Sequence, residues 1–527
     1  MSEEIQESII KDNIIIHNEE ESPVNLRRAE NNLVDAQQSL KHRVTALLMA
    51  AGSGILFDYF FAEEYLGLSV LIFTMVMMGA VLYSVKSQIQ LSKKISLVWG
   101  IPSILLALSF SLYNNPVLKS LNILLIPLLI TGYLITVRYE QVKGISLALA
   151  ANIVDRMFNK ALMTSPKFIS FSKEIIKSGK EVKENATRKS IIRGLMISIP
   201  LLIIIIMLLS SADMMFNYYI QSIGDLFGRF NNSSVIGHTF LITLITLYMF
   251  GLLWSFKYSH IPYQEEAMGV VKACWEPVTM ITILVMVNTA YLLFTVVQVA
   301  YLYGGGADAL PMGFSYAEYA RRGFFELILV TIINFAIVML GMNLMKKSQG
   351  VIHKVANLSY SLLIVFTFNM LGAASYKMYL YEKAFGFTRL RVFVQVFMIL
   401  IGILLIILLL GIWIKKTPVL KYSVIAALTV YTALNFINID RIIAKENILR
   451  YEETGKIDVG YIMNLSYDAM PEVVRLLNAD ETEVSQQIRE HLERQKEIMH
   501  DKYDQWYEYN YYKSQFLNRI DKVLPRT

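Results

Sequence analysis

The chain is poor in the residues that build soluble enzymes and metal sites. Only 17% of its 527 residues are charged, whereas a soluble domain usually carries about 25%. A single cysteine, Cys274, excludes an internal disulfide framework and a cysteine-based metal cluster. The seven histidines are scattered, and no two of them have ligand spacing on one helix. We therefore expect neither a metal ion nor a cofactor.

The sequence motifs of common enzymes are also absent. The chain has no phosphate-binding P-loop, no HExxH zinc helix and no GxSxG nucleophile elbow. The net charge of +6 comes from bases in the middle of the chain, mostly in loops between apolar segments. A nucleic-acid-binding protein would instead gather its bases on one folded polar face. These absences argue against a nucleic-acid partner and lean against an enzyme.

The chain does have long apolar stretches. It is 55% hydrophobic, and its mean hydropathy is +0.45. A stretch of about 17–25 apolar residues crosses a bilayer as a helix, because a helix satisfies its own backbone hydrogen bonds. The sequence therefore predicts an all-α, polytopic transmembrane bundle of about 11 helices. We expect the spans at residues 44–61, 66–85, 95–113, 118–137, 191–211, 236–256, 277–301, 320–344, 356–376, 392–414 and 419–438.

The first predicted span is the weakest of the set. Gly52 and Gly54 lie inside it, and Asp58 lies near its end. Glycine lowers helix stability, and a carboxylate is costly in a bilayer. We therefore expect a short or broken helix at this place.

The distribution of Lys and Arg predicts an orientation. Short loops in the cytoplasm carry an excess of these residues, and the best fit places the N-terminus inside. With an odd number of spans, the C-terminal tail lies outside the cell. We expect no cleavable signal peptide, since the first 43 residues are polar. The predicted parts are an acidic segment 1–43, four spans in 44–137, a basic linker 138–190, seven spans in 191–438 and a helical tail 439–527.

Two polar segments have more than one interpretation. The linker 138–190 is basic and amphipathic, so we expect it to lie against anionic lipid headgroups, with docking of a cytoplasmic protein as the alternative. The end of the tail is rich in aromatic residues, among them Trp506, Tyr507 and Tyr509. Such residues form a belt at the membrane interface, and stacking on a sugar or peptide ligand is the functional alternative.

Unusual polar and charged residues gather at the predicted outer face. Arg and Lys are disfavoured there, so their presence requires nearby acids or an anionic ligand. A salt-bridge network between helix ends, a substrate or ion site, and a site for a phospholipid headgroup or a wall polymer all remain open. The candidate residues are Asp58, Asp213, Glu318, Tyr319, Arg321, Arg322, Glu326, Lys377, Glu382, Arg389, Arg391 and Asp440.

Glu326 is the most informative member of this outer cluster. It lies about six residues into the predicted span 320–344, hence about 9 Å along the helix axis. Arg322 precedes it by four residues, so both lie on the same helix face. A carboxylate at this depth is expected to face the bundle interior and to find a partner.

Several stretches resemble a known family of bacterial polytopic membrane proteins, described as domain of unknown function 4173 and related to number 4153. The matching stretches are Ser210–Asp213, Tyr316–Leu327, Lys377–Arg391 and Gly455–Pro471, of which the second (YAEYARRGFFEL) is the most specific. The resemblance implies a bacterial cytoplasmic membrane location. It implies no activity, so no catalytic residue can be assigned from it.

Three functions fit these patterns. A transporter or permease for a small solute on the envelope side would use the outer polar cluster and the helix breaks near Pro102 and Pro200. An envelope sensor or regulatory membrane subunit would use the tail outside and the basic linker inside. A membrane-embedded transferase acting on a lipid-linked substrate would use the outer acids and arginines. The sequence favours the transporter and leaves the other two as alternatives.

Overall fold

The chain is a multi-pass membrane protein built from helices. The computed structural model describes residues 40–62, 66–84, 94–140, 142, 144–176, 233–257, 274–302, 324–346, 349–414, 417–478, 483–500 and 505–523. Throughout these ranges the only extended pairing is an isolated bridge between Trp275 and Met345. Eight of the described helices are long and apolar enough to cross a membrane, or nine if the bent pair α18 and α19 forms one span.

Every predicted span except 191–211, which lies outside the described residues, coincides with a helix. These helices are α3 (Leu40–Phe61), α4 (Leu68–Ser84), α5 (Lys94–Leu112), α6 (Pro116–Arg138), α12 (Ser233–Ser255), α13 (Pro277–Leu302), α15 (Phe324–Leu344), α16 (Gly350–Phe385), α17 (Arg389–Trp413) and α18 (Val419–Asn435). The all-α bundle is thus confirmed. The count of eleven stays a prediction, since α4 has only 17 residues and α18 reaches spanning length only together with α19.

The first helix bundle consists of α3, α4, α5, α6 and α12, and its closest contact corrects the expectation for the first span. The helix α3 runs unbroken over 22 residues. A side chain at Gly54 would come within 2.7 Å of the Ile242 carbonyl oxygen and 2.1 Å of the Thr246 hydroxyl on α12. Small residues let membrane helices approach closely. Gly54 therefore marks a packing contact and not a helix break.

The second helix bundle consists of α13, α15, α16 and α17. Its core is apolar, but buried amides join the helices at depth. Asn288 donates to the Ser359 carbonyl at 2.9 Å, and Asn334 donates to the Thr367 hydroxyl at 3.0 Å. Such interhelical hydrogen bonds are the expected role of polar residues inside a membrane bundle. The helix α16 has 36 residues, hence a length of about 54 Å, which exceeds a hydrocarbon core of about 30 Å.

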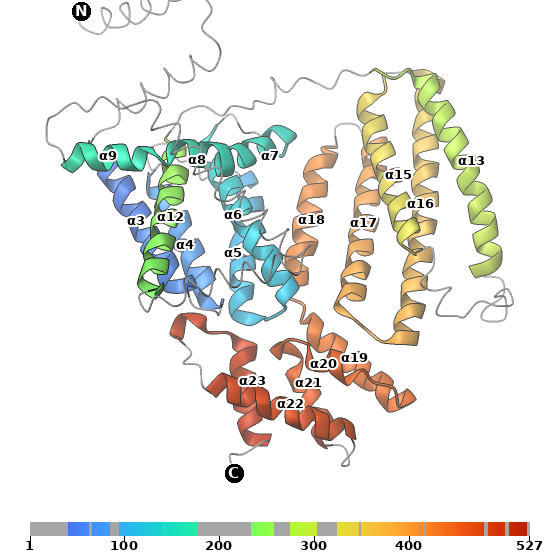
Figure 1. Ribbon diagram of the computed structural model, residues 1–527. Helices are drawn as coiled ribbons and strands as arrows, with labels where there is room; N and C mark the ends of the chain where they lie inside the picture. The colour runs from blue at the N-terminus through green and yellow to red at the C-terminus, as the bar shows by residue number, and fades with distance from the viewer. Residues whose placement is uncertain are drawn as a thin grey trace, which may run out of the picture.

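The helix α18 connects the two bundles and leads into a helical cap. It packs on α5 and on α17, and the chain bends by 62° before α19. We call residues 439–523 the cap; it lies below the bundles in Figure 1, and its apolar core also includes Leu118 of α6 and Leu434 of α18. Its elements are α19 (Ile439–Thr454), α20 (Val459–Met463), η4 (Tyr467–Ala469), α21 (Met470–Val473), η5 (Val474–Asn478), α22 (Glu483–His500), η6 (Trp506–Glu508) and α23 (Tyr511–Val523).

Short helices cover the opposite end of the first bundle. We call α7 (Leu147–Val154), the π-helical turn η2 (Asp155–Lys160), α8 (Ala161–Thr164) and α9 (Lys167–Ile176) the linker helices. They run across the bundle at the end remote from the cap (Figure 1). We refer to the two ends of the bundles as the linker end and the cap end.

Candidate functional site: the junction of the helices and the cap

The residues of the predicted outer cluster lie in separate places. Those outside the described residues are Asp213, Glu318, Tyr319, Arg321 and Arg322. The described members are Asp58 of α3, Glu326 of α15, Lys377 and Glu382 of α16, Arg389 and Arg391 of α17, and Asp440 of α19. The pair Arg389 and Asp440 forms a salt bridge at the point where the cap meets the helices.

Asp440 is the centre of the first group of contacts in this junction. Its side chain is buried, and Arg389 donates to both carboxylate oxygens, from Nε at 2.8 Å and from Nη2 at 2.6 Å. The Asn115 amide donates to Oδ1 at 2.9 Å, and the Ser466 backbone N–H donates to Oδ2 at 2.9 Å. One carboxylate therefore joins α17, the turn between α5 and α6, and the cap.

Helix caps place these two charged residues. Thr388 caps α17, and Asn438 caps α19, each accepting a backbone N–H hydrogen bond from the residue three positions on. Arg389 is consequently the first residue of α17, and Asp440 is the second residue of α19. A carboxylate near a helix N-terminus is favoured by the helix dipole.

Asp468 is the centre of a second group of contacts, made without an arginine. It is buried, and Asn114 donates to it twice, from the backbone N–H at 2.7 Å and from the side-chain amide at 3.3 Å. The same Asn114 amide donates to Asn510 at 2.5 Å. Asn510 in turn donates to the carbonyls of Phe110 at 2.8 Å and Tyr113 at 3.2 Å. These contacts attach the cap to the turn between α5 and α6.

The two carboxyl groups differ in their electrostatic environment. Burial alone would raise the pKa of Asp440, but the hydrogen bonds and the charge of Arg389 lower it below its usual range. Burial raises the pKa of Asp468 to about 6, with a further increase from the charge of Asp440 and an opposing effect of the Asn114 hydrogen bonds. Asp468 therefore titrates close to neutral pH, whereas Asp440 stays ionised.

An amide layer lies next to the junction within the helices. Asn122 of α6 donates to Asn435 of α18 at 2.7 Å and to Ser109 of α5 at 3.3 Å. The Tyr431 hydroxyl donates to the Asn122 carbonyl oxygen at 2.7 Å. Neutral hydrogen bonds of this kind hold α18 against the first bundle beneath the cap.

Glu382, Arg391 and Lys377 lie near the turn between α16 and α17. Glu382 is fully buried and accepts a hydrogen bond from Gln395. The Arg391 guanidinium lies 4.2 Å from the centroid of the Tyr381 ring and donates to the Gly386 carbonyl. These contacts fold the turn on itself, and they come from protein groups on α16 and α17.

The position of Glu326 differs from the expectation. The residue is exposed on α15, whose described part begins at Phe324. Its charge interacts with that of Lys377 on α16. The exposed carboxylate thus interacts with a base of the helix against which α15 packs.

Asp58 belongs to another contact. It lies 2.8 Å from the Nδ1 atom of His238, so the pair joins α3 to α12. His238 is 46% exposed, which makes this a surface contact at the cap end of the first bundle.

Half of the junction consists of residues that were not among the predicted candidates. Asn114 and Asn115 lie in a turn that carries no base, and Asp468 and Asn510 lie in the tail. A signal was present, because Asn115 precedes Pro116, a pair typical of a helix start. Asp468 also lies within Gly455–Pro471, a stretch that carried the family resemblance.

The junction is a docking contact and has the composition of a scaffold. Its carboxylates accept hydrogen bonds from protein groups, and no group of three metal-ligating residues occurs in the described part of the chain. The stretch 458–471 contacts the helices through Asp468 and through the Tyr461 hydroxyl, which accepts from the Arg389 backbone N–H at 2.8 Å. The cap therefore rests on the turns between the helices.

The sequence model of a family described as a domain of unknown function (DUF4153) matches residues 100–476 of the chain. The match supports a membrane family of unknown function and names 4153, the relative given with the resemblance, whereas the label 4173 is not confirmed. No significant match was found among curated proteins or among solved structures.

Proposed function

Since this chain belongs to the DUF4153 family, whose description names no activity, we propose its function from its own geometry: it is a sensor or regulatory subunit of the cell envelope. The cap receives the signal outside the cell, and the linker helices report it inside. The observation that carries this proposal is the junction, in which buried polar contacts join the cap to both helix bundles.

The first support is that the cap is attached on two sides. Arg389 belongs to the second bundle, and Asn114 belongs to the first. Buried polar contacts of this kind add little net stability but are sensitive to geometry. A shift of the cap would change the contacts to both bundles together.

The second support is a direct path from the cap to the linker helices. Asn115 caps α6 at the cap end. The same helix ends at Arg138, and α7 begins at Leu147, only a few residues later. Arg138 donates to the Phe256 carbonyl at 3.3 Å, so the far end of α6 is also tied to α12. A rigid helix with fixed contacts at both ends can transmit a displacement.

The linker helices suit a position at the inner membrane surface. Leu147, Val154 and Phe158 are exposed, and Lys160, Lys167 and Lys173 lie along the same segment. Apolar side chains would enter the lipid, and the bases would bind anionic headgroups. This fits a bacterial cytoplasmic membrane with the cap outside, and a cytoplasmic protein is the expected receiver of the signal.

A transporter is the second candidate function. Two helix bundles with α18 between them resemble the parts that move in alternating access, and Pro102 and Pro127 lie inside α5 and α6. Most described members of the outer cluster contact other protein groups, which makes them weaker candidates for a solute site, although Oε1 of the buried Glu382 has no hydrogen-bond partner among the described residues. The transferase alternative rests mostly on Asp213, Glu318, Arg321 and Arg322, which lie outside the described residues.

The test is to break the junction and to observe the linker helices. In the full chain reconstituted in nanodiscs, Arg389→Gln removes the bidentate contact to Asp440. We expect amide hydrogen exchange in α7, α8 and α9 to become several-fold faster, in addition to faster exchange in the cap. The matched control is Arg441→Gln, because Arg441 pairs with Glu472 inside the cap and reaches neither bundle.

Exchange that changes in the cap alone would contradict the sensor. A transporter predicts a different result: solute uptake into proteoliposomes would persist when the linker helices are deleted, whereas a sensor would lose its output.

A further inference from the structure

A buried carboxyl group lies beneath the turn that joins α16 to α17. Glu382 belongs to the last turn of α16 and is 0% exposed. Gln395 of α17 donates a hydrogen bond to Oε2, but Oε1 has no hydrogen-bond partner among the described residues. Asp155 is the other described acid with such an oxygen, and it lies in the linker helices. Buried polar atoms nearly always have a partner, so the Glu382 carboxyl group requires an explanation.

Few charged groups surround Glu382. The helix α16 packs on α13, α15 and α17. Helix α13 has no charged residue, and the described part of α15 has only Glu326, whose charge interacts with that of Lys377. On α17, Arg389 is engaged by the cap. The base that remains on α17 is Arg391, and its charge interacts with that of Glu382.

Arg391 lies near the carboxyl group but bonds to other groups. Its guanidinium donates to the Gly386 carbonyl and lies 4.2 Å from the centroid of the Tyr381 ring. Gly386 has a φ of 81°, which favours glycine, and its N–H donates to the Glu382 backbone carbonyl at 2.7 Å. No hydrogen bond joins the side chains of Arg391 and Glu382, both of which the structure describes.

The cap holds the same turn from outside. The Asn447 amide of α19 donates to the Phe387 carbonyl at 2.9 Å and accepts from the Phe387 N–H at 2.8 Å. Arg450 of α19 donates to two of the last carbonyls of α16, those of the exposed Lys383 at 3.3 Å and of Ala384 at 2.7 Å. A change in the turn would therefore alter the contact between the cap and the second bundle.

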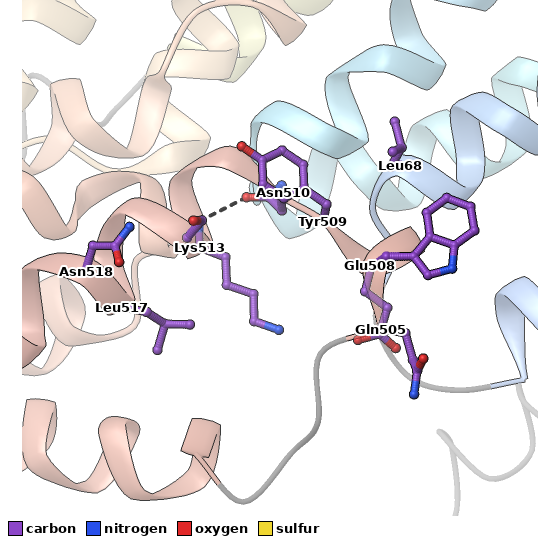
Figure 2. A pocket seen from close by; sticks show the side chains of 10 residues that line it. Leu68, Gln505, Glu508, Tyr509, Asn510, Lys513, Leu517 and Asn518 are labelled. Carbon is purple, nitrogen blue, oxygen red and sulfur yellow. Dashed lines mark hydrogen bonds between the residues drawn. The ribbon is translucent and has the colours of Figure 1, made fainter.

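The cap contacts the first bundle without a comparable acid. Figure 2 shows part of this contact, a cavity of about 430 Å³ that is lined by Leu68 of α4 and by Glu508, Tyr509 and Lys513 of the cap. The Leu68 N–H donates to the Tyr509 carbonyl at 3.2 Å. Glu508 and Lys513 are buried and already have partners within the protein. Among the residues described there, none is an acid with an unpaired buried oxygen.

An unpaired neutral group is less costly to bury than an unpaired charge. We propose that Glu382 is a proton-binding site of the second bundle: it is protonated while Arg391 bonds to Gly386, and it ionises when this guanidinium turns toward it. The hydrogen bond from Arg391 to Gly386 then breaks, and a salt bridge from Arg391 to Glu382 forms. The released proton passes to water at the cap end, since the exposed Phe385 lies only about 5 Å further along the helix axis. This site does not depend on the proposed sensor function.

Infrared difference spectroscopy of the full chain, in a detergent without ester or carboxyl groups, tests for the proton. The Asp468→Asn background removes the titration of the junction, and spectra are compared between about pH 6 and pH 9, above the ordinary range of carboxyl groups. We expect the C=O band of a protonated carboxyl group, which shifts in D₂O and disappears at the higher pH. Glu382→Gln should remove this band completely. The matched control is Glu472→Gln, because Arg441 and Arg475 keep that carboxylate ionised.

Hydrogen exchange of the turn tests the movement of Arg391. Asn447 protects the Phe387 N–H, so the exchange of this amide, corrected for the intrinsic effect of pH, reports the state of the turn. We expect it to become several-fold faster when Glu382 ionises. In Arg391→Gln this response should be lost, because the glutamine has no charge to follow the carboxylate, and Arg441→Gln within the cap should retain it.

Gln395→Leu gives a readout that retains Glu382 and does not require the substituted carboxyl position to fold. The ionised form loses its hydrogen-bond donor, so the infrared band should persist to a higher pH than in the wild type. A spectrum without a band that Glu382→Gln removes would overturn the proposal, and so would a band that is unchanged at pH 9. A titrating band without any change in the exchange of Phe387 would overturn the role of Arg391.

Discussion

The junction holds two buried carboxylates, Asp440 and Asp468, whose charges are stabilised by different kinds of groups. Both belong to the cap and lie against the ends of the helices. Asp440 pairs with an arginine through two hydrogen bonds. Asp468 accepts hydrogen bonds from the backbone and side-chain amides of Asn114, and the charges of Lys119 and Arg389 also interact with it. The charge and hydrogen bonds of Arg389 offset the burial of Asp440, so the pKa of Asp440 falls. The hydrogen bonds of Asn114 do not offset the burial of Asp468, so the pKa of Asp468 rises to about 6.

Because of this difference, we expect only one of the two contacts of the cap to depend on pH. A carboxylate paired with arginine keeps its charge over the whole physiological range of pH, so its contact is constant. A carboxylate held by dipoles loses much of its charge close to pH 6, so its contact varies with the medium. The cap therefore has a permanent contact and an adjustable contact within one interface.

The largest expected effect is the loss of the permanent contact. Asp440→Asn leaves the Arg389 guanidinium partly buried beside a neutral amide, and removal of one partner from a buried ion pair costs about 3 kcal/mol. Heat-induced unfolding of the full chain in detergent, together with the rate of tryptic cleavage of the cap, measures this loss. If Asp440→Asn destabilised the chain no more than the loss of an exposed ion pair within the cap does, the contact between Asp440 and Arg389 would be dispensable.

The next effect concerns pH and Asp468. Its folded pKa of about 6 lies above the ordinary value of 3.8 for aspartate, so folding opposes its ionisation. The penalty is absent below about pH 4, grows as the pH rises toward 6 and is complete above that value. The contribution of Asp468 therefore makes the docked cap more stable as the pH falls from 7.5 to 4.5, by about 2 kcal/mol.

The measurement is the difference between wild type and Asp468→Asn in cap unfolding at several pH values. The asparagine stays neutral, so this difference should shrink as the pH falls and Asp468 becomes neutral too. The same series with Asp440→Asn should change less near pH 6, and only because the charge of Asp440 contributes to the raised pKa of Asp468. A difference that is constant between pH 4.5 and 7.5 would mean that Asp468 does not titrate in this range.

The membrane helices could be predicted from the sequence, because the length and apolarity of a segment decide whether it spans a bilayer. The charged residues Arg389 and Asp440 could also be recognised as unusual, since bases are disfavoured at the outer face. Their pairing could not be predicted. It depends on how α17 and α19 are brought together in space, and no local pattern encodes that arrangement.

The partners of Asp468 show the same limit more clearly. Asn114 and Asp468 are 354 positions apart in the chain, and asparagine in a turn is ordinarily explained by local capping. The exposure of Glu326 also differs from the expectation. Helical spacing tells which residues share a face, but it does not tell which face the neighbouring helices cover.

The smallest expected effect concerns Glu472 of the cap. It tests whether the stability contributed by the Asp440 ion pair depends on the burial of its arginine partner and not on charge pairing alone. Glu472 of the cap is also buried, and burial would raise its pKa, yet Arg475 and Arg441 lower it. These arginines are about half exposed, so Arg475→Ala alone should cost less than about 1 kcal/mol and should depend on salt. The double variant, Arg475→Ala with Arg441→Ala, leaves the Glu472 carboxylate without either arginine. In a double-mutant cycle of thermal unfolding, its loss of stability should exceed the sum of the losses in the two single variants. Additive costs would indicate that water already compensates Glu472, and the contrast with Asp440 would then reflect solvent access.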